Sequence, residues 1–205
     1  MKYESKEERL EAFLAKMVNR KAYKSKELNR WSSNLSRDLK ELEEKNLLTN
    51  AGHGIYYQSE KLGSFNLPVD ENSLLEKFLN DSKFMTRTYG EYNDLRLGTT
   101  QHTPNLVLVY NKKRDGVFTL DGKTYVFKRK KFPSKNFDEF LLVDMLNNLE
   151  NLGEDKNFIL DNLKKRWASN FELDKKVILF QAKRYGKYWV KKFFEKLGNY
   201  NELTA

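Results

Sequence analysis

The residues best suited to chemistry in this chain are small polar and cationic side chains within residues 33–40. Such groups can hydrogen-bond to the base edges and phosphate oxygens that a DNA duplex presents to a protein helix. The sequence therefore predicts a DNA-binding surface at this place. The side chains concerned are Ser33, Asn34, Ser36, Arg37 and Lys40.

An amphipathic helix would hold these side chains on one face. Leu35, Leu39 and Leu42 recur at helical spacing, so they predict a buried stripe opposite the polar groups. Ser32 or Ser33 can cap the free amide groups at the start of this helix. An ordinary amphipathic helix that binds no ligand has the same pattern.

A β-hairpin is predicted directly after this helix. Asn50-Ala51-Gly52 and Gly54 allow a tight turn, and Ile55–Tyr57 has the composition of a returning strand. His53 lies between two glycines, where its ring would contact a phosphate or remain in solvent. A helix followed by a short hairpin is typical of winged-helix DNA-binding domains.

Two earlier helices are predicted to complete this domain. Leu10, Phe13, Leu14 and Met17 form an apolar stripe, and a shorter helix from about Ser25 to Trp31 would bury Leu28 and Trp31. Three helices followed by a hairpin have the order of a helix-turn-helix domain with a wing.

Composition indicates an anionic partner. The 205 residues carry a net charge of +9 and no cysteine, which excludes disulfides and thiolate metal sites. Residues 1–58 carry 12 basic and 9 acidic side chains, and residues 128–205 carry 17 and 11. A polar N-terminal segment, and no long apolar run, predict a cytoplasmic protein.

The fold class predicted for the whole chain is α+β. A winged helix-turn-helix over residues 1–58 would be followed by a linker at residues 59–69 and a larger α+β domain over residues 70–205. Asp121-Gly122 indicates a hairpin within an antiparallel sheet. Helical spacing from Phe137 onward predicts C-terminal helices.

The chain resembles the AbiEi family, the antitoxins and autoregulators of type IV toxin–antitoxin systems. The GIYY wing carries part of the resemblance. The rest lies in three segments: YNDLRLGTTQHTPNLVLVYNKKRDG (Tyr92 to Gly116), FDEFLLVDMLNNL (Phe137 to Leu149) and RYGKYWVKKFFEKL (Arg184 to Leu197). Many members have a proline close after the TTQ run, whereas this chain has TTQHTP. That departure leaves open whether the usual partner is kept.

The resemblance implies a repressor that binds inverted repeats in the double-stranded DNA of its own promoter. It also implies that the chain counters a nucleotidyltransferase-type toxin. DNA contacts are then expected at the helix residues above, at His53 and Tyr56 on the wing, and on a basic C-terminal surface. That surface would comprise Lys164, Lys165, Arg166, Lys183, Arg184, Lys187, Lys191 and Lys192. No cofactor, metal ligand or catalytic residue is expected.

Two other functions fit parts of the sequence. One is a protein-interaction module whose basic face neutralises an acidic partner without binding DNA. The other is a metal-dependent nuclease, because Gln181-Ala182-Lys183 after VILF mimics a strand-borne acid-x-Lys element, with Glu91 and Asp94 as upstream carboxylates. Glutamine is a weak metal ligand, and the segment has helical spacing.

A run of four cations, KRKK at residues 128–131, follows the alternating aromatic residues Tyr125 and Phe127. We expect it to be a basic strand end that faces phosphate or solvent.

Overall fold

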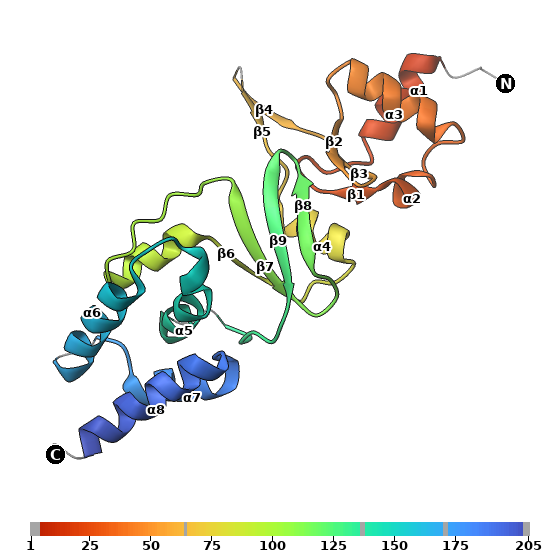
Figure 1. Ribbon diagram of the computed structural model, residues 1–205. Helices are drawn as coiled ribbons and strands as arrows, with labels where there is room; N and C mark the ends of the chain where they lie inside the picture. Colours follow the sequence, from red (N-terminus) through yellow and green to blue (C-terminus); the bar gives the residue numbers. More distant parts are fainter. Residues whose placement is uncertain (1–4, 64, 136–137, 170–171, 203–205) are drawn as a thin grey trace. The chain divides into compact units, whose positions relative to one another are not determined.

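The computed structural model describes residues 5–63, 65–135, 138–169 and 172–202 (Figure 1). Helices and strands are mixed, so the fold class is α+β, as the sequence predicts. The chain divides into two compact units. Unit 1 comprises Met1–Phe84 and Lys113–Tyr125, and unit 2 comprises Met85–Lys112 and Val126–Ala205.

Unit 1 begins with helices and short strands that alternate along the chain. Strands β1, β3 and β2 form a sheet in that order, and β4 pairs with β5. Helices α1, α2 and α3 gather beside the first sheet (Figure 1). The elements are α1 (Lys6–Leu14), β1 (Tyr23–Lys24), α2 (Ser25–Leu28), α3 (Leu35–Glu44), β2 (Thr49–Gly52), β3 (Ile55–Tyr57), β4 (Glu60–Leu62), β5 (Phe65–Leu67), α4 (Glu71–Leu79), β8 (Gly116–Leu120) and the first residues of β9 (Lys123–Arg129).

The helices of unit 1 pack through the apolar positions that the sequence predicts. Ser5 and Glu8 form a capping box at the start of α1, which satisfies amide groups that the helix leaves unpaired. Leu10 from α1 and Leu42 from α3 are buried in one core. The same core contains Phe13, Met17, Tyr23, Leu28, Leu39 and Leu48.

Helix α2 is shorter than expected. It ends at Leu28, and turns occupy the positions up to Trp31. The Trp31 ring packs edge-on against Phe13 at 5.9 Å and Tyr23 at 5.4 Å between ring centroids, yet it stays partly exposed. Trp31 therefore covers the edge of the core and does not fill its centre.

The hairpin predicted after α3 is present. Strands β2 and β3 pair antiparallel, with Thr49 opposite Tyr57. Gly52, His53 and Gly54 at the turn have φ angles of 96°, 53° and 69°. Glycine adopts this left-handed region without strain, which is why two of the three positions are glycine.

The segment expected to be a linker contains a second hairpin. In β4 and β5, Glu60 lies opposite Leu67 and Leu62 lies opposite Phe65. Helix α4 follows, capped by Asp70, and its buried apolar side chains belong to unit 1. The division between the units therefore comes at Phe84, beyond the expected linker at residues 59–69.

Unit 2 combines short strands with a group of helices. β6 and β7 pair antiparallel, with Met85 opposite Tyr110. The helices expected over the C-terminal region are present, although Phe137, the first residue of the expected stripe, lies outside the described residues. The elements are β6 (Met85–Arg87), the 3-10 helix η1 (Tyr89–Leu95), β7 (Leu106–Asn111), the last residues of β9, α5 (Asp138–Asn148), the 3-10 helix η2 (Leu149–Asn151), α6 (Lys156–Ala168), α7 (Lys175–Tyr185) and α8 (Tyr188–Glu202).

Helix α5 forms the centre of unit 2, because every residue from Phe140 to Asn148 is buried. Helices α7 and α8 contribute Ile178 and Phe194 to the same core. The break between them is at Gly186, where a Cβ atom would lie 2.6 Å from the carbonyl oxygen of Ala182. Among the described residues, no helix combines the length and the apolar character that crossing a membrane requires.

Candidate nucleic-acid interface

Helix α3 presents a polar face to solvent and an apolar face to the core of unit 1. Leu39 and Leu42 are 5% and 0% exposed. The predicted side chains on the other side are all exposed: Ser33, Asn34, Ser36, Arg37 and Lys40, a set we call the α3 polar face. The arrangement follows from the helical period, since side chains three or four residues apart share one face.

The start of α3 differs from the expected cap. Asn34 is the N-cap residue, and its side chain makes no capping hydrogen bond. Ser32 accepts a hydrogen bond from the Asn34 amide at 2.9 Å and donates one to Asp38 Oδ2 at 2.6 Å. Ser32 therefore fixes the turn before the helix, and the Asn34 side chain remains in solvent at the end of the polar face.

A buried carboxylate that the sequence pattern does not predict holds α3 against α1. Asp38 is 0% exposed and accepts a hydrogen bond from Arg9 Nη2 at 2.6 Å. With Ser32 on its other oxygen, the carboxylate has a donor on each side. Asp38 fixes the rotation of α3 about its axis, which decides the direction in which the polar face points.

The two cations of the α3 polar face make little contact with the rest of unit 1. Lys40 Nζ lies 3.8 Å from Glu44 Oε1, and these side chains are 79% and 66% exposed. Ion pairs this exposed contribute little to stability. Within the described part of the chain, Arg37 forms no ion pair. Both cations can therefore reach an anion without first breaking a strong interaction.

The hairpin turn is packed within unit 1. The His53 ring is exposed but makes edge-to-face contacts with Phe78 at 5.2 Å and Phe118 at 5.7 Å. The Ala51 carbonyl accepts from the Asp121 amide at 3.0 Å, and Tyr57 donates to Asp121 Oδ1 at 2.9 Å. The β8–β9 turn thus holds the hairpin, a contact that no local pattern predicts.

Tyr56 lies away from the turn. It pairs with Tyr23 across β1 and β3, and it packs, half-buried, against the helical core. Burial, and to a lesser extent the charge of Glu43, raises the pKa of Tyr56. Its position is therefore on the sheet beside the core, and the tip of the expected wing is His53.

The C-terminal cations of unit 2 lie on α6, α7, α8 and the turn before α8. Arg166 and Lys191 are half-buried, and Arg166 Nη1 donates to the Leu95 carbonyl at 2.6 Å. Lys164 pairs with Asp161 at 2.8 Å, and Lys192 pairs with Glu195 at 2.7 Å. The other six cations of the predicted surface are exposed: Lys164, Lys165, Lys183, Arg184, Lys187 and Lys192.

Only two cations of the KRKK run, Arg129 and Lys131, are exposed as expected. Lys130 Nζ lies 2.9 Å from Asp144 Oδ1, and Lys128 Nζ donates to Asn148 Oδ1 at 2.7 Å. Both acceptors are buried. Because alternate side chains of a strand share a face, Lys128 and Lys130 both point toward α5.

These lysines belong to a buried network, the Asp144 cluster. Asp144 Oδ2 accepts hydrogen bonds from the Tyr92 hydroxyl at 2.8 Å and the Tyr110 hydroxyl at 2.7 Å. Asn148 Nδ2 donates to both hydroxyl oxygens, at 3.0 and 3.1 Å. Burial, and then the charge of Asp144, raises the pKa of each tyrosine. The network connects η1, β7 and β9 to α5.

The nuclease-like segment has a different local structure from the one that the motif requires. Gln181, Ala182 and Lys183 lie on α7, so they are helical and not strand-borne. Glu91 pairs with Arg87 at 2.7 Å. Within residues 5–63, 65–135, 138–169 and 172–202, no group of three or more histidine or carboxylate side chains is placed to hold a metal ion.

Comparison with protein-family models, curated proteins and solved structures found no match to this chain.

Proposed function

We propose that the chain binds double-stranded DNA through the α3 polar face and regulates transcription from its own promoter. The observation that carries this proposal is the exposure of Arg37 and Lys40 beside the small polar side chains at the start of α3. A helix that offers cations to phosphates and short polar groups to base edges has the chemistry for binding in the major groove.

The order of elements in unit 1 supports a winged helix-turn-helix. Helix α1, strand β1, helices α2 and α3, and the hairpin β2–β3 follow one another, with the strand order β1-β3-β2. In such a domain the helix before the hairpin enters the major groove, and here that helix is α3. The resemblance to AbiEi antitoxins adds the proposal that the chain counters a nucleotidyltransferase-type toxin.

A titration of the full chain with a fluorescent duplex from its own upstream region tests the DNA proposal. The slope of log affinity against log salt changes by about 0.9 for each phosphate neutralised. The double substitution Arg37→Ala with Lys40→Ala should weaken binding and flatten this slope by up to about 2. The control, Lys16→Ala with Lys83→Ala, removes the same charge from exposed positions of unit 1 outside α3.

The result that would overturn the proposal is an Arg37 and Lys40 variant with wild-type affinity at both low and moderate salt. A loss of the same size in the control variant would assign the effect to net charge and remove the role of α3.

A protein-interaction module is the second candidate, and a feature of unit 1 favours it. Leu62 and Phe65 face each other across the β4–β5 hairpin and are 65% and 75% exposed. Neighbouring exposed apolar side chains form a patch, and a contiguous apolar patch of a few hundred Å² marks a protein contact. Absence of duplex binding, together with capture of a co-encoded acidic protein that Leu62→Ser with Phe65→Ser abolishes, would select this function.

A further inference from the structure

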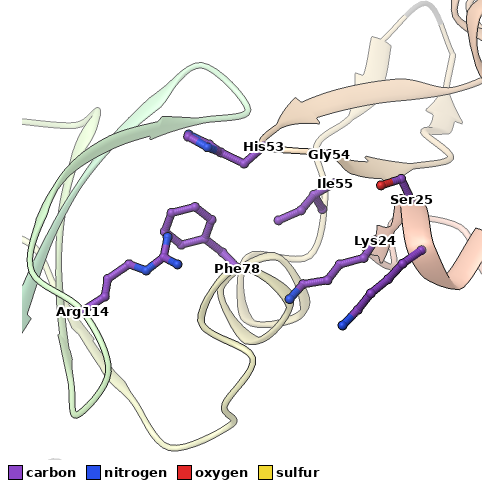
Figure 2. A pocket seen from close by; sticks show the side chains of 8 residues that line it. Lys24, Ser25, His53, Gly54, Ile55, Phe78 and Arg114 are labelled. Atoms are coloured by element: carbon purple, nitrogen blue, oxygen red, sulfur yellow. The ribbon is translucent and has the colours of Figure 1, made fainter.

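Unit 1 contains a cationic pocket built from segments far apart in the sequence. Its volume is about 360 Å³, within the range of small-molecule sites. Figure 2 shows Lys24 and Arg114 reaching in on either side of the Phe78 ring. Ser25, Lys26 and His53 also line it, and no Asp or Glu is among the described residues that do. We call this site the cationic pocket.

Positive charge is concentrated at this pocket. Burial lowers the pKa of Lys24, and so do the charges of Lys26, Lys77 and Arg114, against an opposing effect of Glu27. The Glu27 carboxylate is engaged elsewhere: it pairs with Lys77 at 2.7 Å and accepts from the Lys24 backbone amide at 2.8 Å. Among the described residues, neither Lys24 nor Lys26 has an ion-pair partner. An anion in the pocket would relieve this repulsion.

Aromatic rings hold the arginine of the pocket in place. The Arg114 guanidinium lies 4.2 Å from the centroid of the Phe78 ring and 5.3 Å from that of Phe118. A guanidinium stacked on a ring keeps its N–H donors in a fixed plane, a geometry that suits phosphate. His53 packs edge-on against the same rings, so the apolar wall and the guanidinium donors form one contiguous group.

The backbone keeps a hydroxyl and a turn at the pocket. The Ser25 amide donates to the Gly54 carbonyl at 2.9 Å. Gly54 has a φ of +69°, and a Cβ atom there would lie 3.3 Å from Ser25 Oγ. Glycine at this position therefore allows the turn and leaves space for the Ser25 hydroxyl beside the two lysines.

We propose that the cationic pocket binds a phosphoryl group. Lys24, Lys26 and Arg114 supply positive charge and N–H donors, Ser25 supplies a hydroxyl donor, and Phe78 supplies an apolar wall. The phosphoryl group can belong to a free compound such as a nucleotide or to the backbone of DNA, and only the second source rests on the proposed function.

The first measurement is isothermal titration calorimetry, in which the full chain is titrated with inorganic phosphate, with AMP and with adenosine. Phosphate and AMP should bind, and adenosine, which lacks the phosphoryl group, should not. Lys24→Gln and Arg114→Gln should each weaken binding about tenfold, because each removes a charge-assisted hydrogen bond. Lys16→Gln, an exposed lysine of unit 1 outside the pocket, should leave it unchanged.

The second measurement separates the two sources. Duplex affinity of the Lys24→Gln and Arg114→Gln variants is compared with wild type across salt concentrations. If the variants lose AMP binding but keep the wild-type slope of log duplex affinity against log salt, the pocket binds a free ligand. If that slope is flattened by about 0.9, the pocket binds a DNA phosphate. If the chain binds no DNA at all, the titrations with phosphate and AMP still decide the proposal.

Stability is checked by thermal denaturation, and Lys26→Gln, at an exposed position, replaces any variant that fails to fold. The proposal is overturned if phosphate and AMP do not bind and the duplex slope is unchanged in the pocket variants. It is also overturned if phosphate binds equally well to wild type and to both pocket variants.

Discussion

Arg9 of α1 and Asp38 of α3 are joined by an ion pair in which Arg9 Nη2 lies 2.6 Å from Asp38 Oδ1. Asp38 is fully buried, whereas the Arg9 side chain is 34% exposed. The pair connects the first helix to the helix that carries the α3 polar face. Together with the buried Leu39 and Leu42, the pair holds α3 so that its polar side chains reach solvent, although neither partner belongs to that face.

Replacing Arg9 with methionine should lower the free energy of unfolding substantially. The buried Asp38 carboxylate would keep only the Ser32 hydroxyl, and a buried charge that loses its partner costs about 3–5 kcal/mol. We expect a value near the lower end, because water can reach the Arg9 position. Urea denaturation followed by circular dichroism measures the change.

Glu44→Gln is the matched control, since it breaks the exposed Lys40–Glu44 pair of the same helix. A change of less than about 1 kcal/mol is expected there. Equal small losses in the two variants would show that the Arg9–Asp38 pair does not hold α3 in place.

The elements of this fold were predictable where the signal is local. The leucine period of residues 35–42 predicts α3 and its exposed face, and Asp121-Gly122 predicts the turn between β8 and β9. Both signals depend on residues a few positions apart. Helical spacing also predicts the C-terminal helices, which include α7 and α8.

The contacts that organise the candidate site were not predictable, because they join distant positions. Asp38 stands in a run of charges that resembles a solvated helix face, and its partner is 29 residues earlier. The Tyr57–Asp121 hydrogen bond spans 64 residues. Alternation along KRKK shows that Lys128 and Lys130 share a face, but no local feature shows that Asp144 lies below them.

Removing one hydroxyl from the Asp144 cluster should destabilise the chain. Tyr110→Phe keeps the ring but deletes the donor that lies 2.7 Å from Asp144 Oδ2. An unsatisfied buried group costs about 1–3 kcal/mol, and more when it is charged. Urea denaturation of Tyr110→Phe, Tyr92→Phe and the double variant should give non-additive losses, because both hydroxyls serve one oxygen. Additive losses would contradict a shared acceptor.

Alkaline pH should destabilise the fold through the same two tyrosines. Burial first, and Asp144 second, raises the pKa of Tyr92 and Tyr110 above the value of about 10 for an unfolded tyrosine. Between the unfolded and folded pKa values the unfolded chain binds fewer protons, so stability falls as pH rises. The stability that the two buried tyrosines contribute is fully present below about pH 10 and is lost as the pH rises above that value.

Denaturation midpoints measured between neutral pH and pH 11 test this dependence. The decline above about pH 10 should be smaller in Tyr110→Phe than in wild type, because the variant has one fewer shifted group. An identical decline in both proteins would assign the alkaline effect to groups outside the cluster.

The exposed cations of α7 and the turn before α8 should add affinity for DNA without sequence preference. Substituting Lys183, Arg184 and Lys187 together with glutamine should weaken binding to the promoter duplex and to an unrelated duplex by the same factor, because phosphate contacts carry no sequence information. Anisotropy titrations across salt concentrations measure the effect, and each lost phosphate contact lowers the slope by about 0.9. The control substitutes Lys112, Lys131 and Lys135, which are exposed residues of unit 2 that belong to none of the helices α6, α7 and α8. An equal loss in the control would mean that net charge, and not this surface, sets the affinity.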